Sequence, residues 1–136
     1  MTNIEFVLHH KEKNFIYDFG LVTLGPGYSF TFPDLLAGTY DLYAKGEYKY
    51  VRIRIDDVEL RDDVEGQVVE FVVTGDVDGN NVVNEDDSDL LAAAWMASPA
   101  SSHWNSNADL DCNEFINTFD LNLYAAYSTV EGVSLP

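Results

Sequence analysis

The sequence predicts an α+β chain of two modules, with a small antiparallel β-sandwich over residues 1–74 and a pair of loop–helix repeats over 75–130. Residues 131–136 form a short tail. Three observations predict this organisation. Apolar and polar residues alternate in the first half, a 33-residue pattern repeats in the second half, and every basic residue lies before residue 62. Only Thr74 and Gly75 separate the last predicted strand from the first repeat, so we expect the modules to pack as one rigid body.

The first module is predicted to consist of short strands. Side chains at alternate positions of a strand point to opposite faces of a sheet, so alternation of apolar and polar residues indicates a strand with one buried face. The longer predicted strands are 4–8, 28–32, 40–44, 51–55 and 69–73, and shorter ones are expected at 21–24 and 58–60. Short strands at close spacing predict a small two-layer sandwich.

Two segments of this module carry a family resemblance. The segments GYSFTF (27–32) and AGTYDL (37–42) resemble strands of the small Ig-like, transthyretin-like domains of secreted bacterial proteins. The resemblance implies an Ig-like β-sandwich in a protein that lies outside a bacterial cell or on its surface.

The chain is strongly acidic, and its charge is unevenly distributed. It has 136 residues, with 24 Asp or Glu against seven Lys or Arg and a net charge of −17. Such a surface repels phosphate groups, which argues against nucleic acid or an anionic membrane as a partner. The longest uncharged apolar run, 90–97, is too short to span a bilayer, and no signal peptide is visible. Residues 75–136 hold eleven acidic residues and no Lys or Arg, which predicts cation binding.

The second module contains an internal repeat. Two twelve-residue segments, 76–87 and 109–120, match when the chain is shifted by 33 residues. Acidic and amide residues then fall at the same positions of both segments, and the eighth position is apolar in each, Val83 and Ile116. Such a period predicts two copies of a loop that leads into a helix.

Each loop is predicted to bind one Ca²⁺. Oxygen atoms at loop positions 1, 3, 5, 9 and 12, with the main-chain carbonyl at position 7, surround a hard cation with at least six ligands. The predicted ligands of the first site are Asp76, Asp78, Asn80, the carbonyl of Val82, Asn84 and Asp87. Those of the second site are Asp109, Asp111, Asn113, the carbonyl of Phe115, Asn117 and Asp120. The general EF-hand pattern has Gly at position 6 and Glu at position 12, and both loops differ from it there.

A loop followed by a helix, twice, with Asp at position 12 resembles the dockerin module of cellulosomal and other secreted bacterial proteins. The segments GDVDGN (75–80) and NADLD (107–111) are close to the signature of that family, and the match covers residues 75–128. The resemblance implies a protein partner, a cohesin domain on a scaffold protein. It also implies contact residues at loop positions 10 and 11, which here are Glu85, Asp86, Thr118 and Phe119.

The sequence does not predict an enzyme. His9 and His10 are adjacent, so on a strand they point to opposite faces, and His103 lies in a predicted loop. None of them has a nucleophile or a second metal ligand at a recognisable spacing. Cys112 is the single cysteine and is expected to be a free thiol.

The sequence leaves three functional hypotheses open. The leading one is a calcium-stabilised extracellular structural protein that assembles head-to-tail with itself into a fibre, through basic residues of the first module and the acidic second module. That basic stripe consists of Lys45, Lys49, Arg52 and Arg54. The alternative is a dockerin-type adaptor that binds a cohesin domain. The third is a carbohydrate-binding module in which tyrosines such as Tyr43, Tyr48 and Tyr50 stack on sugars.

Overall fold

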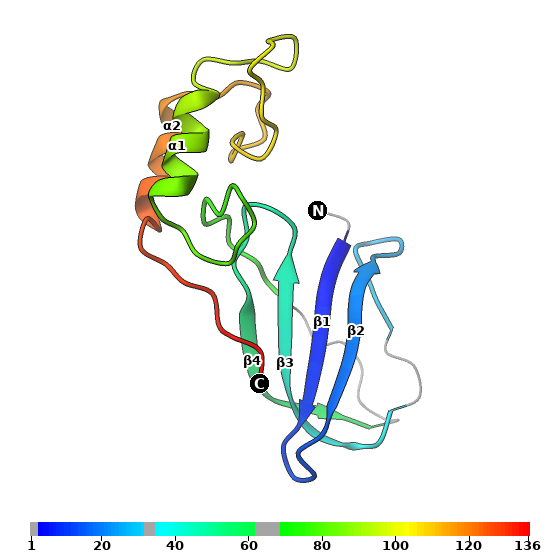
Figure 1. Ribbon diagram of the computed structural model, residues 1–136. Coiled ribbons are helices and arrows are strands. Elements are labelled where there is room, and N and C mark those ends of the chain that lie inside the picture. Colours follow the sequence, from blue (N-terminus) through cyan, green and yellow to red (C-terminus); the bar gives the residue numbers. More distant parts are fainter. Residues whose placement is uncertain (1–2, 32–34, 62–68) are drawn as a thin grey trace. The chain divides into compact units, whose positions relative to one another are not determined.

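The computed structural model describes residues 3–31, 35–61 and 69–136. Its elements in chain order are β1 (Asn3–His10), β2 (Ile16–Thr23), β3 (Gly38–Gly46), β4 (Ile53–Leu60), α1 (Glu85–Ala93) and α2 (Thr118–Ala126) (Figure 1). The chain divides into two compact units. Unit 1 comprises Met1–Gly46, Arg52–Glu70 and Val133–Pro136, and unit 2 comprises Glu47–Val51 and Phe71–Gly132. The connection between β3 and β4 therefore belongs to unit 2.

Unit 1 contains a four-stranded antiparallel sheet in the order β2-β1-β3-β4 (Figure 1). The strand β1 is central, because it pairs with β2 on one edge and with β3 on the other. Ile4 and Leu8 are buried on one face of β1, and Val7 is buried on the other. Because β1 is buried on both faces and paired on both edges, it has no free edge for a further strand.

Aromatic side chains cover one face of this sheet. The ring of Phe30, from the segment after β2, stacks on Phe6 of β1 with the ring centroids 5.6 Å apart. The Tyr40 hydroxyl donates a hydrogen bond to the carbonyl of Leu36, which lies in the same segment. His10 is buried, and its ring lies 4.8 Å from each of the rings of Phe15 and Tyr40. In the described residues, this face is thus covered by aromatic side chains and not by a second sheet.

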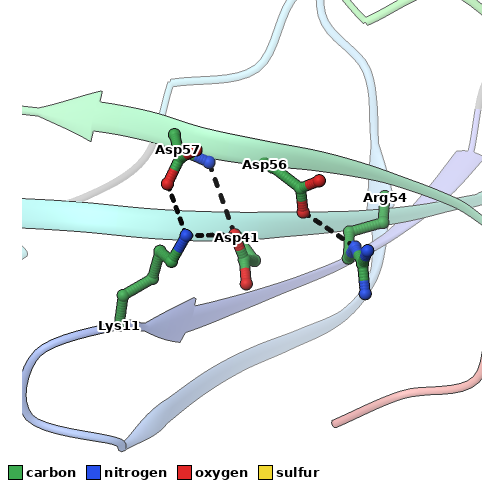
Figure 2. A network of polar contacts seen from close by, with 5 residues as sticks. All are labelled: Lys11, Asp41, Arg54, Asp56 and Asp57. Atoms are coloured by element: carbon green, nitrogen blue, oxygen red, sulfur yellow. Dashed lines mark hydrogen bonds and ion pairs between the residues drawn. The ribbon is translucent and has the colours of Figure 1, made fainter.

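A β-bulge and a polar network connect three strands (Figure 2). Asp41 of β3 faces two residues of β4, Asp56 and Asp57, because the pairing register shifts between Tyr40 and Leu42. The Lys11 ammonium, just after β1, contacts the carboxylate of Asp57 and lies 3.7 Å from Oδ1 of Asp41. The hydrogen bond to Asp57 raises the pKa of Lys11 above its usual value. Because Lys11 and Asp57 are both exposed, their ion pair contributes little to stability.

The predicted Ig-like sandwich is wrong, and the structure gives the reasons. The described residues contain one sheet rather than two layers. Residues 28–31 make only an isolated bridge, because Tyr28 has a left-handed φ of 55° that ends an extended strand, while Phe32 lies outside the described residues. Apolar and polar residues alternate in residues 69–73 because most of this segment packs in unit 2 and not in the sheet. Val73 contacts the core of unit 2, and the Phe71 ring lies 5.9 Å from that of Tyr50.

Unit 2 has a small apolar core between the two loops and their helices. The helices α1 and α2 lie side by side in Figure 1, and the Tyr124 hydroxyl of α2 donates a 2.9 Å hydrogen bond to the carbonyl of Asn84 at the start of α1. The buried core residues are Val77, Leu91, Ala94, Ala97, Ala108, Leu110 and Ile116. Val77 and Leu110 each follow the first residue of a loop, so packing of these side chains in the core holds the start of each loop in place.

The predicted fold class is corrected accordingly. The described residues form mostly sheet with two nine-residue helices, and an Ig-like sandwich packed on a dockerin-like pair of repeats is not the architecture observed. No helix in the described part of the chain is long and apolar enough to cross a membrane.

Gly38 provides a test of the packing in unit 1. A Cβ atom at this position would lie 2.3 Å from Nε2 of His10, and that ring cannot move because it is held between Phe15 and Tyr40. We expect Gly38→Ala to lower the free energy of unfolding by about 1–3 kcal/mol, measured by chemical denaturation. Gly25→Ala is the control, because its Cβ would have only ordinary contacts, 3.6 Å or longer, with Ser29. Equal stability of the two variants would contradict this account.

Candidate functional site

The two acidic loops of unit 2 have the same backbone conformation. The fourth position has a left-handed φ in each loop, 75° at Gly79 and 60° at Cys112. The sixth position does too, with 74° at Asn81 and 64° at Glu114. Left-handed φ values are uncommon outside glycine, so their recurrence at matched positions establishes that both copies of the repeat form the same loop.

Each loop brings three carboxylates together. Asp76, Asp78 and Asp87 each offer an oxygen atom, and these atoms lie within 4.8 Å of one another. The matched residues Asp109, Asp111 and Asp120 form an equivalent cluster. The side chains at the first and twelfth positions are buried in both loops, whereas Asp111 at the third position is exposed. The loops therefore hold acidic groups inside the protein without a basic residue among the three.

Backbone amides hold the buried carboxylates of the first loop. Oδ2 of Asp76 accepts a hydrogen bond from the N–H of Asn81 at 2.9 Å. Asp87 accepts from two amides, with Oδ1 3.2 Å from the nitrogen of Asp78 and Oδ2 2.9 Å from that of Asn84. These bonds wrap the loop around its own carboxylates.

The second loop repeats this arrangement. Oδ2 of Asp109 accepts from the N–H of Glu114 at 3.0 Å. Oδ1 of Asp120 accepts from the N–H of Leu110 at 2.7 Å, and Oδ2 accepts from the N–H of Asn117 at 2.8 Å. Each buried carboxylate therefore has its orientation fixed by the main chain.

The predicted ligands Asn84 and Asn117 are the N-caps of the two helices. The side-chain oxygen of Asn84 accepts from the N–H of Asp86, and that of Asn117 accepts from the N–H of Phe119, both at 2.9 Å. Both helices begin with a complete capping box, in which the third helical residue, Asp87 or Asp120, accepts from the N-cap amide. Negative charge in the first helical turn is also favoured by the helix dipole.

The remaining predicted ligands also lie in the loops. Oδ1 of Asn80 accepts from the N–H of Val82 at 3.0 Å, and Oδ1 of Asn113 accepts from the N–H of Phe115 at 2.9 Å. Val82 forms an isolated antiparallel bridge with Glu131. Each predicted set of oxygen donors therefore lies within a single loop.

Electrostatic repulsion is the main cost of this arrangement. Unit 2 contains twelve Asp or Glu residues and a single Lys or Arg, which is Lys49. Desolvation and the charge of Asp120 raise the pKa of Asp111 above its usual value. Hard oxygen donors at this spacing suit Ca²⁺, and a divalent cation would remove the repulsion.

The predicted basic stripe is divided between the units. Lys45 is buried in β3, and Arg52 pairs with Glu5 of β1 at 2.7 Å. Arg54 pairs along β4 with Asp56 at 2.8 Å. Lys49 lies in unit 2, where its Nζ donates to the main-chain carbonyl of Asp109 at 2.7 Å. All four residues have partners within their own unit.

The four predicted contact residues lie at the exposed starts of the helices. Glu85 and Asp86 make the start of α1 acidic. Thr118 and Phe119 begin α2, where the Phe119 side chain is 66% exposed. Leu121 is also exposed, so α2 presents apolar side chains where α1 presents charge.

Two solved structures share the fold of this chain. One is an N-terminal interface mutant of a type II cohesin–X–dockerin complex from Acetivibrio cellulolyticus, with a TM-score of 0.70 and 15% identity over 95% of this chain and 83% of the matched chain. The other is a C-terminal interface mutant of such a complex from the same organism, with a TM-score of 0.69, 16% identity and the same coverage. The sequence matches no protein-family model and no curated protein.

These findings correct the family assignment made from the sequence. No family model supports the dockerin signature in residues 75–128, and the structural likeness extends over the sheet as well as the loops. The supported statement is a fold shared with a chain of cohesin–X–dockerin complexes. The predicted membership of the dockerin family and the predicted EF-hand-like loops are therefore wrong, because the likeness to these structures extends over 95% of the chain and no family model matches residues 75–128.

A pair of variants separates a carboxylate that also holds the loop together from one that could act only as a cation ligand. Both oxygens of Asp120 accept backbone N–H bonds, so Asp120→Asn turns an amide group toward an amide donor. We expect a loss of about 1–3 kcal/mol in the free energy of unfolding in EGTA, where only these hydrogen bonds are affected, and a larger loss in calcium, because Asp120 also belongs to the carboxylate cluster. Asp111→Asn, at an exposed position, should lower stability only in calcium. A calcium-independent loss for Asp111→Asn would contradict its role as a ligand.

Proposed function

We propose that this chain is a non-enzymatic, calcium-binding module of an extracellular protein assembly. We propose that it acts by binding a protein partner of the kind found in cohesin–dockerin complexes. The observation that carries the proposal is an exposed apolar start of α2, where Phe119 and Leu121 flank Asp120 of the second carboxylate cluster. The two structural neighbours, which are protein–protein complexes, support a protein as the partner.

The carboxylate clusters support calcium as the cofactor. Two matched sites of three carboxylates lie in a unit with one basic residue, so a divalent ion at each would reduce repulsion within the folded state. The side chains that would hold the ions are Asp76, Asp78 and Asp87 in one loop and Asp109, Asp111 and Asp120 in the other. Bound calcium would supply charge neutralisation and a fixed loop geometry.

The start of α2 is the proposed docking surface. Phe119 and Leu121 are exposed, and Asp120 between them is completely buried in the second cluster. Calcium at the second site would thus fix the part of the helix from which both side chains project. Adjacent exposed apolar side chains mark sites of protein interaction, and aromatic residues such as Phe are enriched at protein interfaces.

Self-assembly into a fibre has less support than a different protein partner. The four basic residues expected to contact an acidic neighbour already have partners within their own unit. The first strand cannot complete the sheet of another copy, because both its edges are paired. Binding of carbohydrate is also less supported, since Tyr43 is buried in unit 1 and Tyr50 packs on Phe71 in unit 2, so that of the three tyrosines only Tyr48 is exposed.

A binding role without catalysis agrees with the state of the histidines. His10 is buried, and its Nδ1 accepts from the N–H of Lys13 at 3.1 Å. His9 pairs with Asn14 at 2.7 Å, and His103 lies 3.1 Å from the carbonyl of Trp95. Each histidine therefore has a structural hydrogen bond.

Calcium should control the stability of unit 2. At a free calcium concentration one hundred times Kd, each site adds about 2.7 kcal/mol to the stability of the folded state. We therefore expect Tm to rise by at least about 10 °C on going from EGTA to saturating calcium, measured by circular dichroism. Magnesium at the same concentration is the control and should have a smaller effect, because it dehydrates reluctantly and needs a stricter geometry. An unchanged Tm in calcium would refute calcium binding.

Partner binding should depend on Phe119. The probe is the type II cohesin of the similar complexes, titrated by calorimetry in calcium and in EGTA. We expect 1:1 binding in calcium that Phe119→Ser weakens by at least about tenfold. Tyr28→Ser is the matched control, because Tyr28 is an equally exposed aromatic residue that lies in unit 1.

The same samples test self-association by light scattering. Calcium-dependent polymers without cohesin binding would favour the fibre hypothesis and would contradict the proposal of a separate partner.

A further inference from the structure

The segment between β3 and β4, residues 47–51, contacts both calcium loops. It connects two strands of unit 1 along the chain, yet it belongs to unit 2. The ring of Tyr48 packs on Gly79, where a Cβ atom would lie 2.9 Å from the ring. The fourth position of the first loop is thus covered by a residue from a distant part of the sequence.

Lys49 makes hydrogen bonds to the same position in both loops. Its main-chain N–H donates to the carbonyl of Asp76 at 2.6 Å. Its side-chain Nζ donates to the carbonyl of Asp109 at 2.7 Å. Asp76 and Asp109 are the first residues of the two loops and are related by the 33-residue repeat. One residue therefore holds two equivalent peptide groups, one with its backbone and the other with its side chain.

The ammonium of Lys49 lies one peptide group away from a buried carboxylate. The peptide between Asp109 and Leu110 accepts from Lys49 through its carbonyl and donates through its N–H to Oδ1 of Asp120 at 2.7 Å. Nζ of Lys49 also lies 3.7 Å from Sγ of Cys112 at the fourth position. The side chain thus contacts the first and fourth positions of the second loop and controls the peptide that orients Asp120.

The backbone of Lys49 is held in an unfavourable conformation. Its φ is 83°, in the left-handed region that lysine rarely adopts. Its carbonyl accepts hydrogen bonds from the N–H of Thr74 at 2.8 Å and that of Gly75 at 3.3 Å. This conformation directs both donors of Lys49, N–H and Nζ, to the loops.

We propose that Lys49 is a positioning residue that couples the two calcium loops, so that calcium affinity at each depends on this segment. The inference rests on the proposed binding of calcium at the two carboxylate clusters. Fixing the first residue of both loops at once reduces the freedom that each loop loses when it closes around an ion. Calcium in one loop then holds Lys49 in place for the other loop.

The sign of the effect separates positioning from simple electrostatics. A positive charge beside a cation site repels the incoming ion, so an unpositioned lysine would weaken calcium binding, and its removal would strengthen it. A positioning lysine has the opposite effect. Removal of its Nζ–H donor leaves the carbonyl of Asp109 without that hydrogen bond and loosens the peptide that holds Asp120.

The test is calorimetric titration of the full chain with calcium alone. We expect Lys49→Met to weaken calcium binding by about tenfold, in the range seen when groups that orient metal ligands are removed. Lys49→Arg retains a charged donor and should restore most of the affinity. Lys13→Met is the matched control, since it removes the same charge from an exposed position in unit 1 and should bind calcium as the unmodified chain does.

Coupling is measured in an Asp76→Ala background, in which the first site is disabled. Loss of the first site should weaken calcium binding at the second site severalfold in the chain with Lys49. It should have little effect in the Lys49→Met variant. Calcium binding by Lys49→Met that equals or exceeds that of the unmodified chain would overturn the inference and leave the proposed function intact. Absence of calcium binding by the unmodified chain would overturn the proposed function itself.

A second variant covers the case in which Lys49→Met does not fold. Lys49→Gly keeps the main-chain N–H and accepts a φ of 83° without strain, while the ammonium is lost. Weaker calcium binding by this variant would support the inference, and unchanged binding would overturn it.

Discussion

The enclosure of like charges is the constraint on which unit 2 depends. Asp87 and Asp120 are completely buried, and each lies among other carboxylates of its own loop. The protein offsets the cost of this burial in two ways within the chain, through backbone amides that donate to the carboxylates and through helix N-termini. Neither supplies a full positive charge. The proposed divalent ion would supply that charge, and little loop entropy would be lost when it binds, because the main chain already fixes the carboxylates.

The features that could be predicted from the sequence are those that depend on the spacing of nearby residues. The 33-residue repeat placed both acidic clusters, since the positions of the carboxylates within a loop follow from the loop itself. The strands at 4–8 and 40–44 were predicted from alternation, and the structure contains them as β1 and β3. The predicted strand at 51–55 also appears, mostly within β4, which extends it to Leu60.

What the sequence did not show depends on contacts between distant segments. Alternation at 69–73 indicated a strand, but it cannot distinguish pairing in a sheet from packing of an extended segment on another core, as Val73 does. The role of Asn84 and Asn117 as helix N-caps was not predicted, because asparagine is also a common cation ligand and these positions were interpreted as ligands. Lys49 lies 27 residues before the first loop, and no local pattern marks it as part of that unit.

The path of the chain through unit 2 limits how this protein can be divided. Its residues come from two stretches that are separated by β4, so no single continuous fragment contains unit 2 without a strand of unit 1. A fragment that starts at Gly75 would lack the only lysine of the acidic unit. Exchange of this unit between proteins, by recombination or by engineering, therefore requires transfer of the β3–β4 connection together with the repeats. The repeats alone are therefore only part of unit 2, and the connection after β3 completes it.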